Sequence, residues 1–131
     1  MQNNRNAYQI KDKKIQFFRV DVEKQGNIKK FYKHYIYPKS VYDEHGLWAF
    51  VRSLMTEEKI KQGRSSDIDS LKVQVCNNSK INEELKAEFN GRLYDVKNVD
   101  PFEFYVDDIN LVLVRSLDKT TYQQEVRYDN E

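Results

Sequence analysis

Apolar and polar residues alternate with a period of two in several short stretches, the pattern of strands whose two faces meet different surroundings. These stretches lie at residues 13–22, 28–38, 47–53, 70–77 and 109–116. Gly26-Asn27 separates the first two, and Asn90-Gly91 separates Phe89 from a further strand that begins near Leu93. Both pairs accept the positive φ that tight hairpin turns need. The spacing therefore predicts antiparallel strand pairs.

Six or seven such strands with little helix predict an all-β fold. A small antiparallel β-barrel would remove most exposed strand edges. We expect only minor helix, for example one turn capped by Asn82. The 131 residues suit one domain. We expect a flexible N-terminal arm at 1–12, a barrel at 13–116 and a polar C-terminal tail at 117–131.

Aromatic residues form 13% of the chain, which argues against disorder. We assign Trp48, together with Val73 and Val75 of the neighbouring strand, to the core. Nine tyrosines are too many for one small core. Amphipathic aromatic side chains suit half-wet interfaces. We therefore predict subunit contacts at four of them: Tyr32, Tyr35, Tyr37 and Tyr42.

The sequence lacks the residue patterns of a catalytic or metal site. His34, His45 and the single cysteine, Cys76, show no zinc-ligand spacing. Paired carboxylates such as Glu57-Glu58 flank loops, where solvated charge is the ordinary role. No glycine-rich phosphate loop is present. We expect no enzyme activity, no catalytic residue, no metal and no cofactor.

Charge and hydropathy limit the classes of partner that we expect for this chain. The chain has 22 basic and 21 acidic residues, so it lacks the global basic excess typical of nucleic-acid binders. A single cysteine rules out an internal disulfide framework. The N-terminus lacks the apolar region of a secretory signal. No apolar run approaches the roughly 18 residues of a membrane span, so we expect no membrane partner.

Residues 54–70 are polar without a clear period, between two apolar strands. Loops of that length inside a compact domain are usually functional or disordered. Gly63, Ser65 and Ser66 provide hinge freedom. The charges of the segment nearly balance, with Lys59, Lys61 and Arg64 against Glu57, Glu58, Asp67 and Asp69. The candidate functional residues are Leu54, Glu57, Glu58, Lys59, Ile60, Lys61, Gln62, Gly63, Arg64, Ser65, Ser66, Asp67 and Ile68.

Two motifs resemble a known family. "LWAFVRSLMTEE" at 47–58 places Trp48-Ala49 ahead of Glu57 and Glu58, and "FNGRLYDV" at 89–96 forms a hairpin signature. In this order the chain resembles the head-tail joining proteins of long-tailed bacteriophages, also called head-completion, head-closure or stopper proteins. The likeness covers about residues 13–116. The chain departs from the family pattern in its first strand, "KKIQFF", and after the glutamates, where "KIKQGRSSD" replaces an alanine-rich continuation.

The resemblance implies a structural role in the neck of the virion. Family members form a ring of about twelve copies under the portal and adaptor. The long loop, here residues 54–70, would act as a gate that closes the exit channel after double-stranded DNA is packaged. The other face would receive the tail-to-head joining or tail terminator protein. Assembly would take place in the host bacterial cytoplasm.

Two alternatives remain open. The chain could instead be a tail-completion or tail-to-head joining protein of the same neck, which would attach to tail tubes rather than filled heads. It could also be a small β-barrel that binds single-stranded nucleic acid through the basic and aromatic stretches "KKIQFFR" and "KKFYKHY".

Overall fold

Strands dominate the chain in a computed structural model that describes residues 10–39, 46–54, 69–76, 80–101 and 108–129. The strands are β1 (Lys13–Gln25), β2 (Ile28–Tyr35), β3 (Leu47–Ser53), β4 (Ser70–Cys76), β5 (Lys86–Phe89), β6 (Arg92–Pro101), β7 (Asp108–Arg115) and β8 (Arg127–Tyr128). No helical element occurs within these ranges, so the minor helix that we expected is not found there. Asn82 instead caps a tight turn, since its Oδ1 accepts a hydrogen bond from the Glu84 N–H at 2.8 Å.

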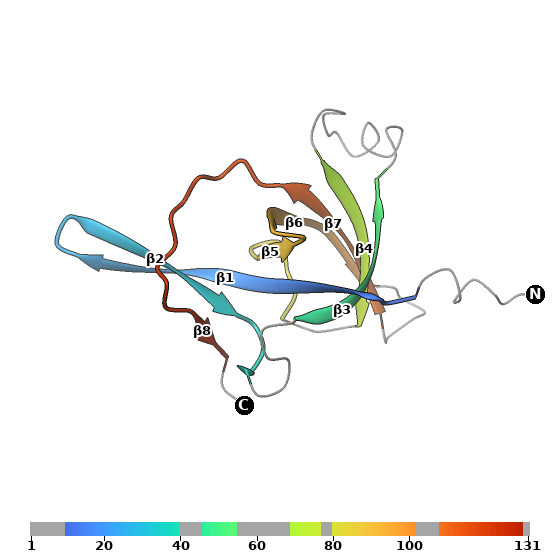
Figure 1. The fold of residues 1–131 in the computed structure, drawn as a ribbon, viewed down its shortest axis with the longest axis horizontal. Helices are drawn as coiled ribbons and strands as arrows, with labels where there is room; N and C mark the ends of the chain where they lie inside the picture. Colours follow the sequence, from blue (N-terminus) through green and yellow to red (C-terminus); the bar gives the residue numbers. More distant parts are fainter. Residues whose placement is uncertain (1–9, 40–45, 55–68, 77–79, 102–107, 130–131) are drawn as a thin grey trace, which may run out of the picture.

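Six of the strands close into a ring. Their order is β3-β4-β7-β6-β5-β1, and β1 pairs back onto β3 (Figure 1). Every pair in the ring is antiparallel. The all-β fold and the small antiparallel barrel predicted from the alternating pattern are therefore confirmed.

The long first strand, β1, is part of the barrel in its first half and of a separate two-stranded ribbon in its second half. Lys13–Ile15 pairs with β3 and Gln16–Phe18 with β5, whereas Phe18–Gln25 pairs with β2. Beyond Phe18 the strand leaves the barrel and forms a two-stranded ribbon with β2, which extends to the side in Figure 1. We call residues 19–34 the arm; from here on the word refers to this ribbon and not to the N-terminal residues 1–12.

Both predicted reversals are present. Gly26, at the tip of the arm, has φ 64°, and the β5–β6 turn has Asn90 at φ 52° and Gly91 at 74°. These left-handed conformations cost glycine nothing and asparagine little, which is why these residue pairs mark hairpins in the sequence. The turn places Phe89 opposite Arg92 and so sets the β5–β6 register.

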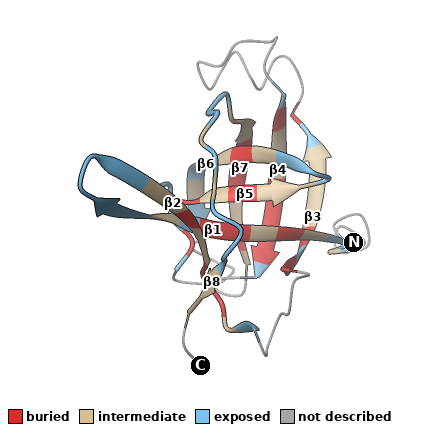
Figure 2. Cartoon of the chain, turned by 60° about the vertical axis from the view of Figure 1, so that its left-hand side comes forward, coloured by how far each residue is buried: buried red, intermediate tan, exposed pale blue. Residues whose placement is uncertain are grey.

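Aliphatic and aromatic side chains form the core. The buried segments, red in Figure 2, lie largely on the strands of the barrel. Ile15, Phe17 and Ala49 are fully buried, as are Val73 and Val75, which the pattern placed inward. Trp48, in contrast, is 54% exposed, because Ala49 and Leu47 take the inward positions of β3. Our assignment of Trp48 to the core was wrong: alternation fixes which residues share a face but not which face is buried.

The C-terminal residues pack across the outside of the barrel. Tyr122 bridges to Phe31, and β8 runs parallel to β2, where Tyr128 lies opposite Tyr35. The ring of Tyr122 meets Phe18 edge-on with centroids 5.7 Å apart. Tyr122 and Arg127–Tyr128, in the stretch that we expected to form a polar tail, thus pair with β2. Their packing explains why Phe18 is fully buried although it points away from the interior.

Candidate functional site

The two ends of segment 54–70 are hydrogen-bonded to each other at one end of the barrel. The Leu54 N–H donates to the Ser70 carbonyl at 2.9 Å, directly beyond the last β3–β4 pair, Ser53 and Leu71. Leu54 is 3% exposed and Ser70 is 3% exposed. We call this end of the barrel the loop end. Of the residues that we proposed for the gate, Leu54 is described; Glu57 to Ile68 lie outside the described residues.

The tyrosines proposed as subunit contacts lie mostly inside this chain. Tyr32 and Tyr35 are each 8% exposed and Tyr37 is 2% exposed, while Tyr42 lies outside the described residues. Tyr35 stacks on Tyr37 with ring centroids 5.9 Å apart and donates a hydrogen bond from its hydroxyl to Glu88 Oε1 at 2.8 Å. Their rings therefore hold the arm and C-terminal residues to the barrel and present little surface to a neighbour.

Other apolar side chains lie on the surface instead. Val22 and Ile28 on the arm are 49% and 63% exposed. Trp48 is the large aromatic residue of the outer barrel wall, with Lys14 Nζ 4.3 Å above its ring. Lys14 and Val22 belong to the same strand, eight residues apart, so the two surfaces lie roughly 26 Å apart. The sequence marked all three as apolar but did not show which would be left uncovered.

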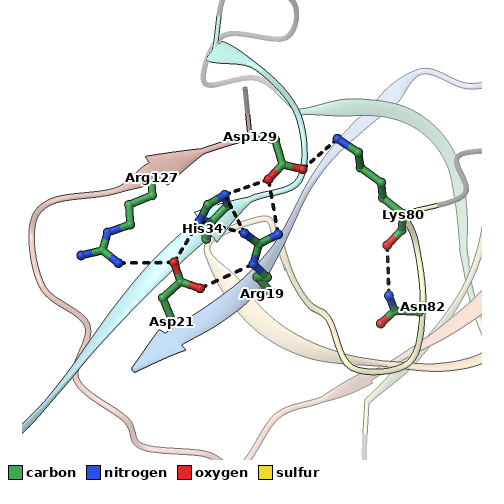
Figure 3. A network of polar contacts seen from close by, with 7 residues as sticks. All are labelled: Arg19, Asp21, His34, Lys80, Asn82, Arg127 and Asp129. Carbon is green, nitrogen blue, oxygen red and sulfur yellow. Dashed lines mark hydrogen bonds and ion pairs between the residues drawn. The ribbon is translucent and has the colours of Figure 1, made fainter. Parts of the chain in front are cut away.

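A network of charged side chains fastens the end of the chain to the arm (Figure 3). His34 lies between two carboxylates: Nδ1 is 2.9 Å from Asp21 Oδ2 and Nε2 is 2.8 Å from Asp129 Oδ1. Arg19 reaches Asp129 at 3.3 Å, and Lys80 reaches it at 2.8 Å. We call this set, with Arg127, the clasp.

Arg127 adds the second half of the clasp. Its guanidinium contacts Asp21 at 3.4 Å and Glu23 at 2.6 Å, and it lies 4.0 Å from the centroid of the Tyr32 ring. These contacts join β8 to both strands of the arm. Sequence reasoning missed the clasp because its members are spread over four separate stretches of the chain, near residues 19–21, 34, 80 and 127–129, and only the fold brings them together.

The electrostatics of the clasp favour ionised carboxylates. Burial by itself would raise the pKa of Asp129, but hydrogen bonds from Lys80 and His34 outweigh it and hold the pKa below its ordinary value. The pKa of Asp21 is lowered in the same way: burial opposes the shift, and the hydrogen bond and charge of His34 prevail. Both carboxylates therefore stabilise the fold in their charged form.

The contacts of the clasp hold Arg127 and Asp129 to the arm. Both ring nitrogens of His34 are engaged by carboxylates, and the lone thiol, Cys76, sits at the far end of β4 in the barrel wall. Among the residues that the structure describes, no group of three or more His, Cys, Asp or Glu side chains could hold a metal ion. Within the same residues, no helix is long and apolar enough to cross a membrane.

Comparison with solved structures shows a similar fold elsewhere. The fold is similar to the solution structure of protein SF1141 from Shigella flexneri 2a, with a TM-score of 0.57 and 15% sequence identity. The match covers 82% of this chain and 94% of that one. At this identity the likeness concerns the fold alone. No protein-family model and no curated protein sequence matches the chain.

Proposed function

We propose that this chain is a structural protein of a bacteriophage neck, a head-completion or stopper protein that assembles as a ring of about twelve copies. The portal and adaptor lie above the ring and the tail docks below it. Residues 54–70 close the channel once double-stranded DNA has been packaged. The resemblance of the "LWAFVRSLMTEE" and "FNGRLYDV" motifs to that family supports the proposal.

The observation that carries the proposal is the attachment of segment 54–70. The Leu54–Ser70 hydrogen bond and the buried Leu54 side chain fix both ends of the segment on a closed barrel. A gate needs such a rigid mount, because a loop that moves must pivot on an element that does not. The polar composition of the segment and its glycine and serine residues fit that role.

The arm gives a second line of support. It is a two-stranded ribbon beyond the barrel, and such a ribbon is only marginally stable unless something packs on it. Its exposed Val22 and Ile28 provide apolar surface for a neighbouring molecule. In a ring, each copy offers its neighbour a different surface from the one that it receives. An extended arm suits that head-to-tail contact.

The test is to shorten the segment in the phage that encodes the protein. Residues 56–68 are replaced by a short Gly-Ser linker, which leaves Leu54 and Ser70 in place. We expect heads that fill but lose their DNA before tails attach, measured as DNA-filled heads by electron microscopy and nuclease-resistant DNA. Filled heads and infectious particles at normal yield would refute the gate.

A matched control separates loss of the gate from loss of the fold. Substitution of Gln25 by serine changes the exposed tip of the arm and leaves the segment intact. The Gln25 variant should melt within a few degrees of the parent, since Gln25 is exposed, and a melting curve of the shortened variant shows whether its barrel is still folded. The free protein should be monomeric in dilute solution, and a stable ring there would contradict assembly on the portal.

A further inference from the structure

A hollow of about 490 Å³ opens at the loop end of the barrel. Its wall is built from the end of β3, the start of β4 and the β5–β6 turn, with Lys13 from the start of β1. Val51, Leu71 and Phe89 line it and pack against the core below. We call this hollow the mouth. The mouth adjoins segment 54–70. The residues that we predicted from the sequence as gate residues or subunit contacts are not among the described residues that line it.

The charges at the mouth come from inward-facing strand positions. Lys13 is two residues before the buried Ile15, Asp69 two before Leu71, Arg92 two before the buried Tyr94, and Arg115 two after the buried Leu113. Side chains two apart in a strand share a face. The interior face therefore changes from apolar to charged where the strands pass beyond the packed core. Charged residues can lie there because water still reaches them.

The mouth carries more positive than negative charge. The carboxylate of Asp69 contacts two guanidiniums: its Oδ2 is 3.1 Å from Arg92 Nη1 and 3.6 Å from Arg115 Nη1. Lys13 lies on the same rim, and within the described part of the chain it pairs with the adjacent Asp12, at 3.8 Å. Among the described residues that line the hollow, Lys13, Arg52 and Arg92 are cations and Asp69 is a carboxylate, and Arg115 reaches that carboxylate from β7.

These cations can be shared with a ligand. The side chains of Arg92 and Arg115 are 53% and 41% exposed, and that of Asp69 is 54% exposed. Ion pairs at such exposure contribute little, so an arriving anion displaces them at low cost. Asp69 nevertheless holds the two planar guanidiniums side by side. Paired guanidiniums match the oxygens of a phosphate group, which they bind in a bidentate way.

We propose that the mouth is a phosphate-binding site and that its ligand is the backbone of a nucleic acid. The apolar floor, with Phe89, gives the sugar or base next to a bound phosphate a surface to contact. The choice of packaged DNA as the ligand rests on the proposed function. The charges that form the site do not depend on it.

The test uses the purified full chain and a short labelled DNA duplex, with binding followed by fluorescence anisotropy over a range of salt concentrations. We expect binding at low salt that weakens linearly on a log–log plot. Arg92→Gln and Lys13→Gln should each reduce the salt slope by about one and weaken affinity several-fold. Circular dichroism and thermal melting confirm that each variant is folded.

Two further variants make the test specific to the mouth. Lys24→Gln and Lys29→Gln, which face each other across the arm, change the same charge elsewhere and should alter affinity less than twofold. Asp69→Asn should tighten binding, because it removes a carboxylate that contacts both Arg92 and Arg115 and so competes with the ligand for them. Equal losses from arm and mouth variants, or weaker binding by Asp69→Asn, would overturn the proposal.

Competition identifies the source of the phosphate. Pyrophosphate is added at ionic strength matched with chloride, and single-stranded DNA is tested beside the duplex. Displacement of the duplex by pyrophosphate far beyond the chloride control would overturn the assignment to a nucleic acid. Absence of binding to either form of DNA at low salt would do so as well. Neither result would touch the neck proposal, which is decided by DNA retention in heads with a shortened segment.

Discussion

His34 Nε2 lies 2.8 Å from Asp129 Oδ1, a contact that joins β2 to the end of the chain across 95 positions of sequence. Asp129 also contacts Arg19 and Lys80, and its side chain is only 14% exposed. A carboxylate so enclosed depends on its partners, because leaving them unpaired costs more than the contacts themselves contribute. The C-terminal residues are therefore held by a few polar contacts, and each can be tested.

Removing the Asp129 carboxylate should loosen β8. We expect Asp129→Ala to lower the free energy of unfolding by about 1–3 kcal/mol, since His34, Arg19 and Lys80 would all lose a partner. Urea denaturation measures the change. Hydrogen exchange should show faster exchange at the Asp129 amide, which donates to the Tyr35 carbonyl. Glu125→Gln is the control, because Glu125 is 69% exposed and lies 3.9 Å from Arg127. Equal effects of both substitutions would argue against the clasp.

Acid should weaken the clasp selectively. The folded pKa values of Asp21 and Asp129 lie below their ordinary value of 3.8, so their stabilisation is full above that value and is lost as the pH falls through the lower folded pKa. The stability difference between the parent and Asp129→Asn, measured by urea denaturation, should shrink from pH 6 to pH 3. A difference that stays constant over this range would show that ionisation of Asp129 does not contribute.

Phe17 and Val22 separate the two halves of β1. Phe17 is fully buried in the barrel, and Phe17→Ala should cost about 3–5 kcal/mol. Val22 lies on the arm at 49% exposure, and Val22→Ala should change stability by about 0.5 kcal/mol or less. Chemical denaturation of both variants gives the comparison. A large loss for Val22 would mean that the arm is packed against more than its own partner strand.

Two glycines with similar backbone angles should respond differently to alanine. Gly46 has φ 80°, and an added Cβ would overlap the Ile15 carbonyl; Gly91 has φ 74° with open space around it. Gly91→Ala should cost only the strain of a left-handed alanine, about 1–2 kcal/mol. Gly46→Ala should cost clearly more, because the backbone must also shift. Melting temperatures of the two variants test this, and similar losses would contradict the close approach of Gly46 to β1.

The exposed position of Trp48 can be read from its fluorescence. It is the single tryptophan of the chain, so emission reports on one site. At 54% exposure we expect emission at long wavelength and ready quenching by acrylamide in the free protein. A shift to shorter wavelength on assembly would place the outer face of β3 in a subunit contact. A shielded tryptophan in the monomer would contradict the orientation of β3.

The sequence determined the strands and their turns. Alternation located β1 to β4 and β7, and Gly26-Asn27 and Asn90-Gly91 specified two hairpins, because positive φ is a local demand that few residues meet. These features depend on residues only a few positions apart, and interactions over that range can be predicted from the sequence directly.

Only the tertiary structure decided which strands pair with one another and which side chains pack together. The closure of β1 onto β3, the division of β1 between barrel and arm, and the packing of Tyr122 over Phe18 all join residues far apart in the chain. Alternation could not tell whether Trp48 or Ala49 would face inward, since a period of two is symmetric between the faces of a strand. The clasp and the mouth arise from the same cause: both are assembled from stretches that the barrel brings together, and no local pattern encodes them.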